Sequence, residues 1–452
     1  MAFVPDIGWG DSKRDGIRFM RQSAGRGIHL GSADEDRRPA AVHERRLDAL
    51  AEVAVKAGLG LAAGQELIVT APCAALPLVR RIAEHAYKAG AVYVHHFFTD
   101  DEMTLMRYRH ANEAAFDFAP EWLFDGLANA LANGAARLTV VGGDPELLAG
   151  EDPAKVARAR HASAKASRPI MELLAGVATN WTTVAFATPS WAKAIFPDAP
   201  ADAAVARLWQ EIFLAARSDG PDPVERWRAH ARDLEARAKF LSNKRYATLR
   251  FVGPGTDLRI GLADGHLWQG GLALSKTGLV CSPNIPSEEV FTTPHRDRVE
   301  GHVTFTRPLC LQGSLIEGAS ITFSTGEVVE ANARVGEDLL RRLLTADEGA
   351  RRLGEVGLVP NSSPVSKSGL FFYNTLFDEN AGSHVALGQA FDKCIDGGDR
   401  MDRDDLLAHG ANRSAVHIDC VIGSAHMDVE AVTADGRRER VMEGGEWVSS
   451  AA

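Results

Sequence analysis

Helical and strand-like stretches alternate between Leu47 and Gly150, and this alternation limits the fold more than any other feature of the sequence. Apolar residues recur at helical spacing in LDALAEVAVKAGLG, ALPLVRRIAEHAYKAGA and PEWLFDGLANALANG. Short buried strands are indicated by QELIVTAP, AVYVHHFF and AARLTVVGGDP. Strands that alternate with helices are typical of a parallel sheet with helical crossovers. With the mainly helical stretch from Pro153 to Asn243, they predict an N-terminal α/β domain over residues 47–243.

The pattern changes near Lys244, where short alternating stretches are separated by glycine-containing turns, as in ATLRFVGPGTDLRIGLADGHLWQGG. Such strands predict a C-terminal α+β domain, largely antiparallel, over residues 244–452, interrupted by a helix in EDLLRRLLTADEGARRLGE. Residues 1–46 are rich in glycine and arginine and lack sustained periodicity. We interpret them as an N-terminal extension and a candidate disordered segment.

Composition agrees with two domains and excludes several classes of protein. A chain of 452 residues is too long for one ordinary core. The formal net charge of -10 argues against a protein that binds nucleic acid by neutralising phosphates. Five well-separated cysteines without a CxxC pair are typical of reduced thiols. No apolar run has the length of a membrane span and the N-terminus lacks an apolar signal core, so we expect a cytoplasmic protein without a membrane partner.

The first candidate metal ligands lie between Leu376 and Gly423, in LFDENAGSHVALG and NRSAVHIDCVIG, which contain His384, His417 and Asp419. His417 and Asp419 are two residues apart, so on a strand both side chains leave the same face and can reach one ion. Their neighbours are apolar, and a buried His or Asp must be paired or coordinated.

Two further segments carry candidate carboxylates: SPNIPSEEVFTTP contains Glu288 and Glu289, and RRLGEVGLV contains Glu355 at the start of an apolar strand. Taken singly, each of these acids is readily explained as a solvated charge or a salt-bridge partner. Three carboxylates and two imidazoles together form a mixed O/N set suited to divalent Zn, Mn or Co. Five ligands exceed the need of one structural zinc and fit a two-metal hydrolytic centre in which one carboxylate bridges the ions.

Several long blocks, in the same order, carry a resemblance to a known family. They are NWTTVAFATPSWAKAIFP, GPGTDLRIGLADGHLWQGG, PNIPSEEVFTTPHRDRVEG, RRLGEVGLV, LFDENAGSHVALGQAF and NRSAVHIDCVIG. The chain from about Leu47 to Val448 resembles the M29 family of metal-dependent aminopeptidases, the thermophilic aminopeptidase or aminopeptidase T group.

The resemblance implies that two divalent metal ions (Zn, Co or Mn) are held by five residues: Glu289, Glu355, His384, His417 and Asp419. It further implies a homodimer whose active sites face an enclosed cavity, which would restrict substrates to short peptides. The mechanism we expect is hydrolysis of the N-terminal peptide bond, in which Glu355 or Glu288 takes a proton and passes it to the leaving amine. The family also has a tyrosine seven residues after the first ligand histidine. Phe391 occupies that position here and cannot donate a hydrogen bond to an oxyanion.

Two alternatives stay open at the level of the sequence. Relatives of this fold that open dihydroxypyridine rings use one non-heme iron and a 2-His-1-carboxylate set, which His384, His417 and Asp419 could form. Glu289 and Glu355 argue against this alternative, because a single iron would not need them, whereas Phe391 is compatible with it. The other alternative is a catalytically dead peptide-binding or structural protein, against which the complete ligand set argues. About two ions per chain are expected of the hydrolase, one iron of the dioxygenase and none of the inactive protein.

Overall fold

The computed structural model describes residues 37–311 and 313–448. Most of the predicted N-terminal extension therefore lies outside the described residues. Helix α1 (Arg37–Val53) begins well before Leu47, where the periodicity predicts its start, and a π-helical segment, Ala54–Leu59, follows it directly. Contacts place Met1–His43 and Glu44–Ala452 in separate units, and the division of the chain near residue 243 stays a prediction.

The first sheet lies in the N-terminal half and is fully parallel, with strand order β2-β1-β3-β4. Its strands are β1 (Glu66–Pro72), β2 (Tyr93–Thr99), β3 (Ala136–Val141) and β4 (Trp181–Ala185). The connecting helices are α2 (Leu76–Lys88), α3 (Asp101–His110), α4 (Glu121–Ala132) and α5 (Pro153–Ala175). This arrangement confirms the predicted α/β fold. The sequence pattern missed β4, a short strand inside a stretch predicted to be mainly helical.

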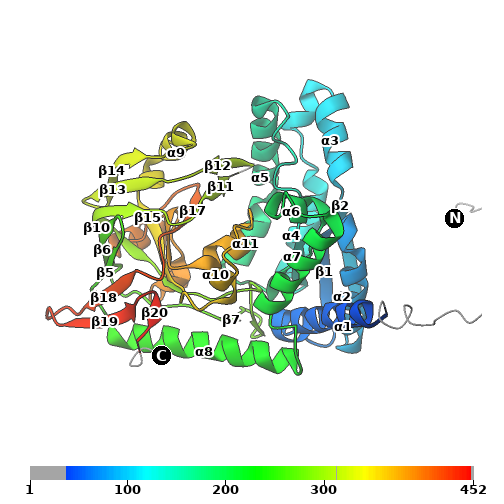
Figure 1. The fold of residues 1–452 in the computed structure, drawn as a ribbon, viewed down its shortest axis with the longest axis horizontal. Coiled ribbons are helices and arrows are strands. Elements are labelled where there is room, and N and C mark those ends of the chain that lie inside the picture. Colours follow the sequence, from blue (N-terminus) through cyan, green and yellow to red (C-terminus); the bar gives the residue numbers. More distant parts are fainter. Residues whose placement is uncertain (1–36, 312, 449–452) are drawn as a thin grey trace, which may run out of the picture. The chain divides into compact units, whose positions relative to one another are not determined.

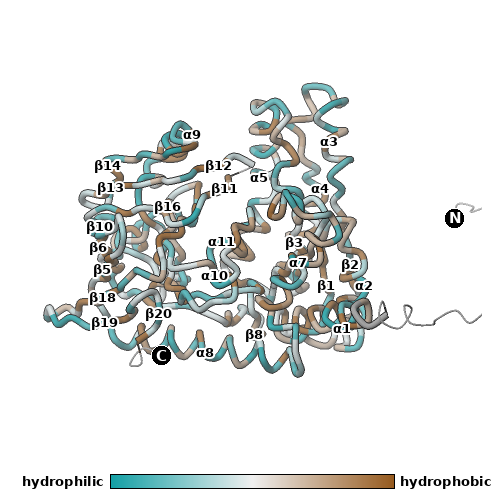
Figure 2. The backbone as a smooth tube through the Cα atoms, in the orientation of Figure 1, coloured by the Kyte–Doolittle hydropathy of each residue, from teal (hydrophilic) through white to brown (hydrophobic). Residues whose placement is uncertain are grey.

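Both faces of this sheet are buried, as a parallel sheet requires. Leu67 and Val69 of β1 point into the main core of the region, whereas Ile68 between them joins a second cluster under α4 and α5. Alternate residues of a strand leave opposite faces, so one strand contributes to two cores. Figure 2 shows brown, hydrophobic backbone in the stretches around β1 and β3.

Three helices follow: α6 (Pro189–Ile195), α7 (Ala201–Ala215) and α8 (Pro223–Lys244). Helix α8 runs from the N-terminal region to the C-terminal one (Figure 1), and it contacts both the π-helical segment and strand β9.

The C-terminal half is mainly antiparallel, as predicted. Its largest sheet has eight strands in the order β14-β13-β10-β6-β5-β18-β19-β20. These strands are β5 (Thr248–Gly253), β6 (Thr256–Leu262), β10 (Pro294–Thr304), β13 (Ser320–Ser324), β14 (Glu327–Asn332), β18 (Asp428–Val432), β19 (Arg438–Glu443) and β20 (Glu446–Trp447). Two small pairs accompany it: β7 (Ala273–Leu274) with β8 (Val280–Cys281), and β11 (Leu309–Leu311) with β12 (Ser314–Ile316). The predicted helix after β14 is shorter than expected, and α9 covers only Glu337–Leu343.

A four-stranded antiparallel sheet, in the order β17-β16-β15-β9, carries the candidate site. Its strands are β9 (Val290–Thr292), β15 (Leu353–Leu358), β16 (His384–Gly388) and β17 (His417–Val421). Helix α12 (Arg403–Ala408) lies between β16 and β17 in the chain.

The segment between β15 and β16 leaves the C-terminal core and packs against the N-terminal one. It contains α10 (Pro364–Ser368) and α11 (Thr375–Asp378), and Leu376 and Phe377 are buried in the core of the parallel sheet. The indole nitrogen of Trp191 donates a hydrogen bond of 2.5 Å to the carbonyl of Phe372 in the same segment. The chain then returns to the C-terminal half as β16, which begins at His384.

Across residues 37–311 and 313–448, none of the helices is long and apolar enough to cross a membrane.

Candidate metal centre

The register of the four-stranded sheet brings the predicted ligands to one face. Glu355 pairs with Ala386, and Ala386 in turn pairs with Asp419. His417 pairs with Gly388 on β16. Because paired residues share a face and residues two apart do too, Glu355, Asp419 and His417 project on the same side of the sheet. The small side chain of Ala386 leaves room between the two acids.

The other two predicted ligands belong to the same face. His384 pairs with Gly357, which pairs with Phe291 on β9. Glu289 directly precedes β9 and is two residues from Phe291, so the alternation of the strand aims it at this side as well. We call this side of the sheet the metal face.

The opposite side of the sheet is packed into the C-terminal core, which explains why the strands read as apolar runs. It is formed by Val290, Val356, Leu358, Val385, Leu387, Ile418 and Cys420. All six residues of β15 and all five of β16 are buried. The metal face therefore rests on a rigid, close-packed layer.

The five predicted ligands converge in two overlapping groups of potential donor atoms, Glu289–Glu355–His384 and Glu355–His417–Asp419. Within the first, His384 Nε2 lies 3.0 Å from Glu289 Oε2 and 3.5 Å from Glu355 Oε1. Within the second, His417 Nε2 lies 3.2 Å from Glu355 Oε2 and 3.4 Å from Asp419 Oδ1. Each oxygen of Glu355 thus faces a different imidazole.

Backbone carbonyls orient both imidazole rings. His417 Nδ1 lies 2.8 Å from the carbonyl oxygen of Gln389, and His384 Nδ1 lies 3.3 Å from that of Gly382. A ring that donates from Nδ1 to a carbonyl presents an unprotonated Nε2, which is the tautomer that ligates a metal.

Gly357 makes room for one of these rings. A Cβ atom at this position would lie 2.3 Å from His384 Nε2 and 2.5 Å from its Cε1. The imidazole of His384 therefore packs directly over Gly357. From there its Nε2 atom reaches Glu289, which lies beside β9 on the other side of β15.

Burial makes the charges of this site interdependent. His384 is 1% exposed and Glu355 is 4% exposed. Burial opposes ionisation of Glu355, but the imidazoles of His384 and His417 outweigh it and lower the pKa of the carboxyl to about 2. Burial instead dominates at Glu289 and raises its pKa, with a further contribution from the charge of Glu355. Burial disfavours a charged His384 too, yet the adjacent carboxylates hold its pKa well above the ordinary value.

The residues fit a divalent metal by chemistry as well as position. Carboxylate oxygens and imidazole nitrogens are ligands of Zn, Mn and Co. Among the described residues, none forms a well-aligned hydrogen bond with the buried Oε2 atom of Glu289, although His384 Nε2 lies 3.0 Å from it. A buried anionic oxygen without a hydrogen bond is costly, and a bound cation would satisfy it.

A fourth acidic residue, Glu379, lies beside the cluster. It begins the 3-10 turn Glu379–Ala381, five residues before His384. Burial raises the pKa of its carboxyl well above the ordinary value, and the charges of Asp419 and Glu289 add to this effect. Sequence reasoning missed it, because in DENAGSH nothing in the spacing separates Glu379 from Asp378.

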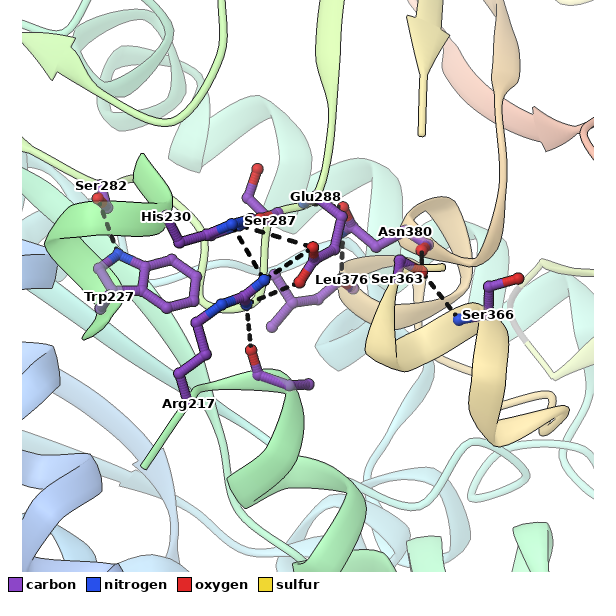
Figure 3. Close-up of polar contacts among 11 residues, drawn as sticks. Arg217, Trp227, His230, Ser282, Ser287, Glu288, Ser363, Ser366, Leu376 and Asn380 are labelled. Atoms are coloured by element: carbon purple, nitrogen blue, oxygen red, sulfur yellow. Dashed lines mark hydrogen bonds and ion pairs between the residues drawn. The ribbon is translucent and has the colours of Figure 1, made fainter. Parts of the chain in front are cut away.

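Glu288, the other predicted catalytic acid, lies apart from both ligand groups. Its carboxylate accepts hydrogen bonds of 2.8 and 3.0 Å from the two terminal nitrogens of Arg217, and it is 4% exposed (Figure 3). His230 Nε2 lies 3.6 Å from the same carboxylate. The backbone N–H of Glu288 donates to Asn380 Oδ1 at 2.6 Å, which joins the start of β9 to the segment that carries His384. Neighbouring residues of an extended chain point to opposite sides, so Glu289 faces the metal cluster and Glu288 faces this network.

Phe391 packs directly on a predicted ligand. Its ring centroid lies 5.0 Å from that of His417 and 5.6 Å, edge to face, from that of Phe291. Its carbonyl accepts a hydrogen bond of 3.2 Å from Thr293 Oγ1. The position that resembles the tyrosine of the family is thus at the metal face, but it presents a hydrocarbon ring.

A parallel α/β region followed by an antiparallel region with a buried, mixed Glu/His/Asp cluster is the arrangement of a metalloenzyme. Comparisons with known proteins identify the family. The family model described as thermophilic metalloprotease (M29) matches residues 43–447. The chain therefore belongs to the M29 family, and the sequence-based assignment to this family of metal-dependent aminopeptidases is confirmed.

Relatives match over almost their whole length. Aminopeptidase T of Thermus thermophilus is 50% identical over 405 residues, which cover 90% of this chain and 99% of the relative. Aminopeptidase 2 of Geobacillus stearothermophilus is 42% identical over 404 residues, covering 89% and 98%. The solved structure of wild-type AmpT from Thermus thermophilus superposes with a TM-score of 0.85 at 49% identity, covering 90% of this chain and 99% of that one.

Proposed function

We propose that this chain removes the N-terminal residue from short peptides at a two-metal centre. The observation that carries the proposal is the position of Glu355, which belongs to both groups of potential donor atoms and directs one oxygen to each histidine. A carboxylate shared in this way can ligate two neighbouring ions, one through each oxygen. Relatives that carry the name aminopeptidase support the choice of reaction.

The five residues would divide between two ions. Glu289 and His384 would hold one, His417 and Asp419 the other, and Glu355 both. When bound, the ions would polarise the scissile carbonyl and lower the pKa of a water molecule. The carbonyls of Gly382 and Gln389 would accept a hydrogen bond from Nδ1 of each imidazole and keep the ring oriented, and Nε2 would give up its proton when an ion binds.

The movement of the proton needs a further acid or base. Of the two candidates from the sequence, Glu355 is committed to the ions and Glu288 is occupied by Arg217. Glu379 is half-buried, its carboxyl interacts electrostatically with Asp419 and Glu289, and it belongs to neither ligand group. We assign to it the transfer of a proton to the leaving amine, for which a raised pKa is suitable.

The dioxygenase alternative is not favoured by this geometry. A 2-His-1-carboxylate iron site would leave Glu289 and Glu355 as two buried acids without a purpose, yet both lie against His384. The metal identity, the homodimer and the cytoplasmic location stay predictions.

Metal content and turnover of the same preparation test the proposal. We expect about two ions per chain after loading with Zn, Co or Mn. We also expect release of arylamine from leucine arylamide that chelation abolishes and metal restores. Glu355→Gln should lower both metal content and turnover, whereas Glu235→Gln, on the exposed side of α8, should change neither. One bound iron, or turnover that survives complete removal of metal, would contradict the proposal.

A further inference from the structure

A lysine, Lys393, lies next to the metal face. Lys393 belongs to the 3-10 turn Asp392–Cys394 and is half-buried. Its Nζ atom lies 5.3 Å from the ring centroid of Phe291 and 5.4 Å from that of Phe391. Within the part of the chain that the structure describes, no carboxylate lies within ion-pair distance of this ammonium. The adjacent Asp392, by contrast, accepts a hydrogen bond of 2.7 Å from Arg413.

The two rings beneath the ammonium are parts of the metal face itself. Phe291 leaves β9 on the same side as Glu289, and Phe391 packs on the ring of His417. The rings contact each other edge to face. They therefore connect the ammonium of Lys393 to the candidate ligands through an unbroken layer of side chains, and they hold the cation at the edge of the site by cation–π attraction.

The acids near the Lys393 ammonium do not neutralise its charge, because they are grouped around the candidate metal positions. Glu289, Glu355 and Asp419 are grouped around the metal positions, and Glu379 lies among them. Lys393 forms an ion pair with none of these four. A half-buried ammonium that pairs with no carboxylate of the described residues is available to a carboxylate that arrives with the substrate.

The chemistry of a short peptide indicates which group this is. Its amino end must lie at the ions for the first peptide bond to be cleaved, so its only obligatory negative charge is the carboxylate at the other end. In a dipeptide that carboxylate is one residue beyond the scissile bond, at a distance of about 4 Å. An ammonium at the edge of the metal face, on a flexible four-carbon stem, is well placed to reach it.

We propose that Lys393 binds the C-terminal carboxylate of dipeptides and other very short substrates and thereby determines a preference for them. The inference rests on the proposed hydrolysis of short peptides. It assigns to Lys393 the selection of substrate, while the reaction itself depends on the metal ligands. Phe391 takes part indirectly, because its ring supports the ammonium.

Three substrates that share one N-terminal residue test the inference: leucylglycine, leucylglycinamide and leucine arylamide. Only the first has a free carboxylate. The variants are Lys393→Met, which keeps the length of the side chain without its charge, and Lys393→Arg, which keeps the charge. Lys239→Met, on the exposed face of α8, is the matched control. Steady-state kcat and KM are measured for metal-loaded enzyme.

We expect Lys393→Met to raise KM for leucylglycine about tenfold, the loss of one charge-assisted contact, while kcat changes little. KM for leucylglycinamide and for the arylamide should stay the same. Lys393→Arg should retain most of the preference, and Lys239→Met all of it. In the unaltered protein, leucylglycine should have a lower KM than its amide.

Two results would overturn the inference. Equal KM values for leucylglycine and its amide in the unaltered protein would show that no carboxylate is recognised. A fall in kcat of Lys393→Met on all three substrates would place the ammonium at the reacting bond instead. If the unaltered protein releases leucine from none of the three, the proposed function fails, and that failure is distinct from the loss of a preference between them.

Discussion

Arg217 Nη2 lies 3.0 Å from Nδ1 of His230, and this contact determines the protonation state of the histidine. A guanidinium only donates, so Nδ1 must accept and carry no proton. The proton is then on Nε2, which lies 2.8 Å from the carbonyl oxygen of Ser287 (Figure 3). His230 is therefore neutral in the folded protein, and burial likewise lowers its pKa below the ordinary value of 6.5.

Acid should weaken the protein through this histidine. In the unfolded chain His230 takes up a proton near pH 6.5, whereas in the folded chain it does so only at lower pH. The stabilisation is thus complete above pH 6.5 and is lost as the pH falls toward the folded-state pKa, by at most about 1.4 kcal/mol per pH unit. Replacement by glutamine preserves an acceptor for Arg217 and a donor for Ser287 but does not titrate. We expect His230→Gln to lose less unfolding free energy than the unaltered protein between pH 6.5 and 5, as measured by urea denaturation. Identical pH dependence of the two proteins would contradict the assignment.

The ion pair between Arg217 and Glu288 should be essential for stability. Both side chains are largely buried, with 16% and 4% exposure, and Glu288 directly precedes Glu289. Removing only the guanidinium strands a buried carboxylate, so Arg217→Met should cost about 3–5 kcal/mol of unfolding free energy. Adding Glu288→Gln should recover most of this loss, because no unpaired charge then remains. Urea denaturation of the two single variants and the double variant measures the coupling. Strictly additive effects would show that the pair contributes nothing as a pair.

Gly357 gives a test of the metal centre that changes no ligand. A methyl group there would lie 2.3 Å from His384 Nε2 and must displace the ring. We expect Gly357→Ala to reduce bound metal and to lower turnover more than tenfold, with an overpacking cost of about 1–3 kcal/mol. The control is Gly126→Ala in α4, where a new Cβ meets nothing within 4 Å, and where alanine favours the helix by about 1 kcal/mol. Full metal content in Gly357→Ala would show that His384 is not held as described.

Phe391 offers a test of gained activity. The resemblance to the M29 family places a tyrosine here, and the ring is in contact with that of His417. A hydroxyl added at this position would supply a hydrogen-bond donor at the metal face. Since one such donor is worth a factor of about 10²–10³ in typical hydrolases, Phe391→Tyr should raise kcat on leucine arylamide by tenfold or more, with little change in KM. Phe371→Tyr, in the loop after α10, adds the same group elsewhere and should have no effect. An unchanged or lower kcat in Phe391→Tyr would mean that another group already performs this role.

The parts of the site that depend on the alternation of side chains along a strand could be predicted from the sequence. His417 and Asp419 share a face because strand geometry dictates it, and Glu355 belongs to a strand that the sequence shows plainly. The family resemblance favoured Glu289 over Glu288 as the ligand, but residue spacing alone could not, because the choice depends on the register of β9 against β15, which is set by long-range pairing. Glu379 was not predicted as a site residue, because it lies in a short 3-10 turn, where no periodic pattern indicates the direction of a side chain. Strand β4 was missed because five residues inside a helical stretch are too few for a distinct period.

The segment between Glu355 and His384 connects the metal centre to the N-terminal half of the protein. Leu376 and Phe377 of this segment are buried in the hydrophobic core of the parallel sheet, whereas the strands on either side of the segment, β15 and β16, belong to the antiparallel half. Unfolding of the parallel-sheet half would therefore release this segment and displace His384 from its pairing with Gly357 on β15. A cation bound at the metal face would hold the four strands of this sheet together, and the anchored segment would couple that stabilisation to the parallel-sheet half.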